Sequence, residues 1–72
     1  MQYDIVYQGQ FKDYHTVTAD SPEAAAAQVM RHYRLERIGH NGTQWFYAEY
    51  KQVMQGTKPM ATIAVTERVD KS

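Results

Sequence analysis

The chain has 72 residues, no cysteine and a formal net charge of zero at pH 7. This length allows one small domain, and the lack of cysteine excludes a disulfide framework and a thiolate zinc site. A neutral chain with a pI of about 6.8 is not expected to bind bulk nucleic acid or an anionic membrane by charge alone. We expect residues 1–72 to form a single domain, with a frayed tail over 69–72.

The first residues of the chain carry an acid and no long apolar run. We therefore expect neither a signal peptide nor a membrane span, and we expect a cytoplasmic protein.

Two short segments at the start of the chain have the composition of β-strands. Residues 3–8 are rich in aromatic and β-branched side chains, and a similar pattern resumes over 11–19. Gly9 and Gln10 between them are suited to a turn. The pattern predicts a β-hairpin.

The signals of a helix start follow this hairpin directly. Ser21 can cap a helix, Pro22 fits the first helical position, and Glu23 lies where the positive end of the helix dipole favours an acid. Apolar residues then recur at helical spacing as far as Tyr33. We expect an amphipathic helix that ends near Leu35.

The pair Asn41-Gly42 is the strongest hairpin signal in the second half of the chain. It predicts a tight turn between a short strand and a long strand that contains the aromatic run 45–47. A loop over 55–59 and a final strand over 60–68 complete the expected elements.

One alternative remains open for residues 46–55. Phe46, Tyr50 and Val53 are spaced for a helix, and Gly56 could cap it. We favour the strand because aromatic residues are common in strands. The expected fold is α+β: a two-layer unit in which an antiparallel sheet of four to five strands carries one helix on one face, in the order ββαβββ.

A single helix covers one face of such a sheet, so we expect the other face to be exposed. Alternation along 45–50 forms two rows, and Glu49, in the row of Trp45 and Tyr47, is expected to face water. We therefore place Trp45 and Tyr47 on the open face. The side chains expected beside them are Tyr14, Val6 and Thr62 or Ala64. Because Trp and Tyr are enriched at binding hot spots, this patch predicts a partner-binding surface. The alternative is a second small core closed by loops or chain ends.

Basic residues gather between positions 31 and 40, namely Arg31, His32, Arg34, Arg37 and His40. Arg31 and Arg34 are three apart, so we expect them on one helix face, where they could grip phosphates or an acidic protein surface. The alternative is that these residues only complement the negative end of the helix dipole.

The chain contains no catalytic or metal-binding motif. His15, His32 and His40 are widely spaced and have no carboxylate at ligand spacing, and Ser21 is better used as a cap than as a nucleophile. We predict that the protein is not an enzyme and holds no cofactor or metal.

The order of hairpin, acid-serine junction, helix and further strands resembles that of very small phage-encoded proteins, which include RNA polymerase inhibitors and some anti-CRISPR proteins. The resemblance covers residues 3–50. The positions that carry it are Tyr3, Ile5, Val17, Ala19, Asp20, Ser21 and Ala25. It implies a stoichiometric inhibitor that docks on a host protein complex, such as a CRISPR effector or RNA polymerase, in the host cytoplasm. The chain departs from the acidic DNA-mimic type because it is neutral and has a basic patch.

Taken together, these observations predict a non-enzymatic interaction module. The residues predicted to contact the partner are Arg31, Arg34, Arg37, Tyr14, Trp45 and Tyr47. Two alternatives stay open. One is a nucleic-acid-binding module that uses the arginines and the exposed aromatics. The other is a self-associating assembly protein that forms a homodimer through its open face or an edge strand.

Overall fold

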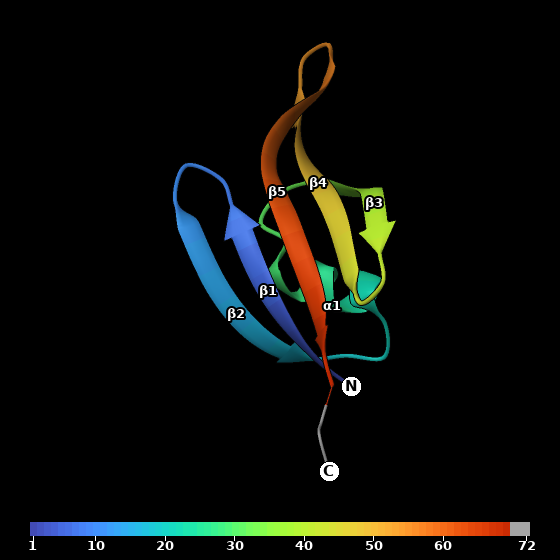
Figure 1. Ribbon diagram of the computed structural model, residues 1–72. Coiled ribbons are helices and arrows are strands. Elements are labelled where there is room, and N and C mark those ends of the chain that lie inside the picture. Colours follow the sequence, from blue (N-terminus) through green and yellow to red (C-terminus); the bar gives the residue numbers. More distant parts are fainter. Residues whose placement is uncertain (70–72) are drawn as a thin grey trace.

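The computed structural model describes residues 1–69, so the predicted tail lies outside the described residues from position 70 onward. The elements in chain order are β1 (Gln2–Gln8), β2 (Lys12–Thr18), α1 (Pro22–Val29), β3 (Arg34–Asn41), β4 (Gln44–Val53) and β5 (Gly56–Arg68). The strands form one antiparallel sheet in the order β2-β1-β5-β4-β3. The helix lies behind one face of this sheet (Figure 1).

Hairpins build most of the sheet from neighbouring segments of the chain. β1 and β2 pair along their whole length, as the predicted hairpin requires. The turn that joins β3 to β4 lies at Gly42 and Thr43, because Asn41 is the last residue of β3 and pairs with Gln44, so it falls one residue later than the predicted Asn41-Gly42 pair. Gly42 has a φ of +60°, which glycine adopts at no steric cost. β5 then returns between β4 and β1, so the first and last strands of the chain are neighbours.

The helix begins where the sequence predicts but ends earlier. The Ser21 side chain accepts a hydrogen bond from the backbone N–H of Ala24 at 3.1 Å. α1 ends at Val29, well before the predicted end near Leu35, and Met30 already has an extended backbone with ψ of 135°. Four residues then lead directly into β3, so the helical spacing of apolar residues in this segment was misleading.

These proportions correct the predicted fold class. About 65% of the residues lie in the strands of one sheet. The eight-residue helix contacts β1, β2 and β5 and covers only part of one face. The strands also do not follow chain order across the sheet. The molecule is therefore mostly antiparallel sheet with one short helix, broadly α+β, and has no full helical layer.

The second half of the chain is more extended than expected. Residues 44–53 form β4, so the alternative helix over 46–55 is wrong. The predicted loop over 55–59 is also wrong, because β5 already begins at Gly56. The ends of β4 and β5 project beyond β1 and β3 as a two-stranded ribbon (Figure 1). We call residues 51–60 the β4–β5 arm.

The hydrophobic core lies between the sheet and α1. Its buried members are Tyr3, Ile5, Tyr7, Ala25, Ala26, Tyr47, Ile63 and Val65. Small side chains at Ala25 and Ala26 let the helix approach the sheet closely, and Leu35 and Trp45 pack at the margin. Among residues 1–69, no helix has the length and apolar character that a bilayer crossing requires.

Candidate interaction surfaces

The two faces of β4 are the reverse of those predicted. Tyr47 is 4% exposed and Glu49 is fully enclosed, and Trp45 in the same row is partly buried and packs against the core. Phe46 and Tyr50 occupy the opposite row and lie on the open face. The prediction that Trp45 and Tyr47 form an exposed patch is therefore wrong. That prediction rested on the expectation that the Glu49 side chain faces solvent.

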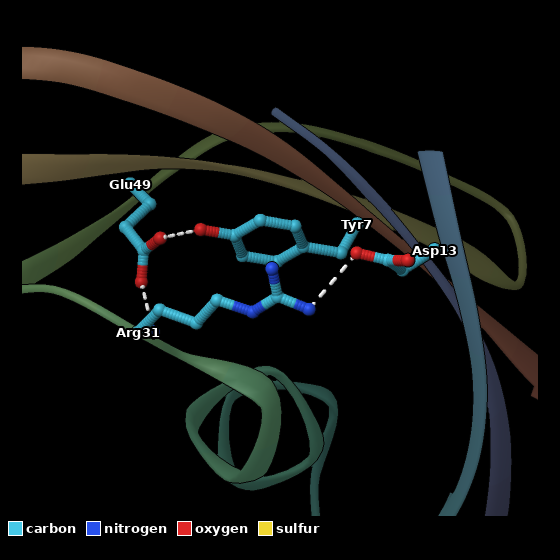
Figure 2. A network of polar contacts seen from close by, with 4 residues as sticks. All are labelled: Tyr7, Asp13, Arg31 and Glu49. Carbon is cyan, nitrogen blue, oxygen red and sulfur yellow. Dashed lines mark hydrogen bonds and ion pairs between the residues drawn. The ribbon is translucent and has the colours of Figure 1, made fainter. Parts of the chain in front are cut away.

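Glu49 is held inside the molecule by three hydrogen-bond donors, of which Figure 2 shows those from Tyr7 and Arg31. Its Oε2 accepts from the backbone N–H of Arg31 at 2.7 Å and from that of His32 at 3.0 Å, and its Oε1 accepts from the Tyr7 hydroxyl. A buried carboxylate needs such partners, because an unpaired one is very costly. These bonds attach the connection between α1 and β3 to β4, which accounts for the end of the helix at Val29.

Tyr7 lies between Glu49 and a guanidinium group (Figure 2). The Cζ of Arg31 is 4.5 Å from the centre of the Tyr7 ring, and Arg31 also donates to Asp13 Oδ2 at 2.9 Å. Burial, followed by the hydrogen bond to Glu49, raises the pKa of Tyr7 to about 12. Tyr7 therefore remains a protonated donor at neutral pH, which is a structural role and not that of a nucleophile.

The three arginines predicted as one patch are separated by the fold. All three lie beyond the end of α1, so they share no helix face. Arg31 is engaged with Tyr7 as described, whereas Arg34 pairs with Glu36 at 3.1 Å on the open side of β3. Arg37 lies on the helix side of β3. The predicted placement of Arg31 and Arg34 on one helix face is therefore wrong.

A shallow groove does bring three predicted residues together on the helix side. Arg37, Trp45 and Tyr47 line a hollow of about 260 Å³ between Leu35 and the start of α1. Burial, and then the charge of nearby Glu23, raises the pKa of Tyr47, so its hydroxyl stays protonated. Sites for small molecules usually measure about 300 to 1,000 Å³. The groove is below this range and is suited to a single side chain.

The open face carries a row of apolar side chains that crosses the sheet. Strand register aligns Tyr14 on β2, Val6 on β1, Ala64 on β5 and Phe46 on β4, and we call these four residues the apolar row. Tyr14 is 71% exposed and the other three are half-buried. On β3 the row ends at Gly39, where an added Cβ would lie 3.5 Å from the Phe46 ring.

Polar residues flank the apolar row on both sides. On one side, Asp4 accepts a hydrogen bond from Thr16 and pairs with Arg68, each at 3.0 Å. The residues aligned on the other side are Lys12, Gln8 and Thr62. An apolar centre with a polar rim is the usual anatomy of a protein–protein interface. Tyr14 was correctly placed on this face from the sequence, whereas Phe46 and Tyr50 were missed.

Other features of residues 1–69 offer little for chemistry. No group of three or more His, Cys, Asp or Glu side chains is arranged there to hold a metal ion. In comparisons with known proteins, no family model matches the chain, and neither a curated protein nor a solved structure is significantly similar to it. The geometry of the surfaces therefore carries the functional argument.

Proposed function

We propose that this protein is a non-enzymatic interaction module that binds a partner protein through the open face of its sheet. The apolar row is the observation that carries this proposal. Its four side chains are aligned across four strands, on a face that no other element of residues 1–69 covers. Tyr and Phe bury a large area with little loss of rotamer freedom, and Tyr in particular is enriched at hot spots.

The helix side of the sheet is less suited than the open face to binding a partner. Three of its polar side chains are engaged within the molecule, because Glu49, Tyr7 and Arg31 bond to one another or to Asp13. The groove at Arg37 is suited to only one side chain. The nucleic-acid alternative placed Arg31 and Arg34 on one helix face, whereas both residues lie beyond α1 and pair with different acids, Asp13 and Glu36, so we favour the protein partner.

A narrower prediction concerns the identity of the partner. The resemblance to phage-encoded inhibitors implies a host complex, such as a CRISPR effector or RNA polymerase, that binding would inhibit. This identity, the cytoplasmic location and the lack of enzymatic activity stay predictions.

A comparison of two phenylalanine variants tests the proposal. Phe46→Thr removes a ring from the apolar row, whereas Phe11→Thr removes a ring that is 73% exposed in the turn between β1 and β2. Immobilised protein is used to capture proteins from a bacterial lysate, and retained proteins are quantified. We expect the wild type and Phe11→Thr to retain the same proteins in similar amounts. Phe46→Thr should retain about tenfold less of them, as for the loss of an interface hot spot.

Unchanged capture by a folded Phe46→Thr variant would contradict the proposal. If Phe46→Thr folds, as judged by circular dichroism, and retains the same proteins in the same amounts, the open face is not the docking surface.

A further inference from the structure

We propose that two copies of this chain pair through the outer edge of β2 and form a two-fold symmetric dimer with a continuous sheet. This inference does not require the partner proposed for the open face, although Tyr14 belongs to both surfaces. β2 is the first strand in the sheet order, so one of its edges has no strand neighbour in the described chain. In Figure 1 nothing lies beyond that edge.

The hydrogen bonds of the first hairpin identify which backbone groups are free on this edge. The N–H of Ala19 donates to Met1 at 3.0 Å, and the N–H of Gly9 donates to Phe11 at 3.1 Å. Because backbone groups alternate in direction along an antiparallel strand, the odd-numbered residues of β2 face β1. The backbone groups of Lys12, Tyr14, Thr16 and Thr18 therefore point outward.

One side chain marks the end of this free edge. Gln28 in α1 donates to the carbonyl oxygen of Thr18 at 2.7 Å, as expected for a carbonyl that points away from β1. The N–H and C=O groups of Lys12, Tyr14 and Thr16 remain, and a second strand could pair with them without disturbing the hairpin.

The other edges carry features that oppose strand pairing. The edge strand β3 has a bulge between Arg37 and Gly39, and it is rich in charged residues. In the β4–β5 arm, Lys51 lies directly opposite Lys58, and Pro59 lacks an N–H donor. Natural sheets use such features to block edge-to-edge association.

β2 has fewer of these protections, with a single lysine, Lys12, at its first position. Its pairing with β1 proceeds without a register shift over the described residues, and its sequence contains no proline. Its only acid, Asp13, is paired with Arg31. The remaining residues of the strand are mostly Tyr, Thr and Val, which favour strands. β2 is therefore the edge best suited to accept another strand.

The sequence of β2 is also complementary to itself. A two-fold axis at His15 places Tyr14 opposite Thr16 of the second copy. At the two ends of the pairing Lys12 lies opposite Thr18, whose carbonyl oxygen already accepts from Gln28, so the Tyr14 and Thr16 backbone groups carry the contact. No like charges face each other in this register, and the outward groups of Tyr14 and Thr16 form a hydrogen-bonded pair. The two Tyr14 rings become diagonal neighbours across the axis, within reach of aromatic side chains. This contact would cover a ring that is 71% exposed in the single chain.

Cysteine cross-linking tests the register. In the proposed dimer His15 faces His15 of the second copy as a non-hydrogen-bonded pair, with Cα atoms about 4.5 Å apart, which permits a disulfide. The natural chain has no cysteine, so His15→Cys supplies the only thiol. We expect mild oxidation to yield a disulfide-linked dimer at least ten times faster with His15→Cys than with Val17→Cys. Two copies of position 17 would lie about 13 Å apart or more along the strands.

A pair of matched lysine variants tests the edge by sedimentation at several concentrations. Thr16 and Thr66 lie on the same open face, and each is aligned with Asp4, but only Thr16 is on the edge. Thr16→Lys places two ammonium groups close to the axis, so we expect the dimer dissociation constant to rise at least tenfold. Thr66→Lys and Phe46→Thr should leave it within about twofold of the wild-type value, which separates this inference from docking on the open face.

Three results would overturn the dimer. They are a wild-type chain that stays monomeric at millimolar concentration, a Val17→Cys variant that cross-links as fast as His15→Cys, and an association weakened equally by Thr66→Lys and Thr16→Lys. Circular dichroism of every variant establishes that it is folded before its association is measured.

Discussion

The two faces of the sheet bury and expose side chains in ways that their residue types alone do not indicate. On the helix side a carboxylate, Glu49, is fully enclosed, whereas on the open side an aromatic ring, Tyr14, is 71% exposed. Glu49 is buried because three donors from other segments satisfy its oxygens. Hydrogen-bond partners, and not only hydrophobicity, therefore decide which face of β4 points inward.

Removing the buried carboxylate should lower the free energy of unfolding more than any other change described below. Glu49→Ala leaves the Tyr7 hydroxyl and the N–H groups of Arg31 and His32 without their acceptor. We expect the free energy of unfolding, measured by urea denaturation, to fall by about 3 to 5 kcal/mol.

The matched control for this substitution is Glu36→Ala, because Glu36 is an exposed acid on β3 that pairs with Arg34 at the surface. Its expected loss is below about 1 kcal/mol. Equal losses in the two variants would mean that Glu49 does not hold the helix side together.

The second test compares neighbouring aromatic residues of β4 that point to opposite faces. Tyr47 is 4% exposed in the core, and Phe46 is half-buried on the open face. We expect Tyr47→Ala to lower the free energy of unfolding by about 3 kcal/mol and Phe46→Ala by about 1 kcal/mol. Thermal unfolding followed by circular dichroism measures both. A larger loss for Phe46→Ala would reverse the assignment of the faces.

The smallest of the three expected effects is a loss of folding stability at alkaline pH, caused by the ionisation of Tyr7 on the helix side. The pKa of Tyr7 is raised from 10.0 to about 12, so the folded state favours the protonated hydroxyl. This contribution is fully present below pH 10 and is lost as the pH rises through 12, by roughly 2 to 3 kcal/mol.

Unfolding of the wild type and of Tyr7→Phe between pH 9 and pH 12 measures this effect. The variant loses the bond to Glu49 at every pH, but its stability should decline less steeply in this range. Parallel declines in the two proteins would show that Tyr7 does not cause the alkaline loss.

Local signals in the sequence predicted the starts and turns of the elements well. The Ser21 cap appears in the structure where it was expected, and the second hairpin turns within one residue of the predicted Asn41-Gly42 pair, because both depend on interactions within a few residues. The N-terminal hairpin was equally local. By contrast, the end of the helix depends on Glu49, which lies 17 to 18 residues along the chain from the N–H groups that it binds.

The candidate surface was only partly predictable for the same reason. Tyr14 was placed on the open face, but the row of Phe46 was exchanged with that of Trp45 because the donors for Glu49 lie far away in the sequence. The arginines were grouped on a helix that does not reach them. Alternation along a strand identifies two rows, and only long-range contacts decide which row is covered.

The β4–β5 arm is the part of the chain where the sequence can vary in evolution at little cost in stability. The arm lies outside the packed body, and its tip residue Met54 is fully exposed, so replacing or lengthening the tip removes little buried surface. The body retains its cap, its core and its enclosed carboxylate whatever the tip becomes. Variation in the reach and chemistry of this projection is therefore nearly free of thermodynamic penalty, and related chains should differ there first.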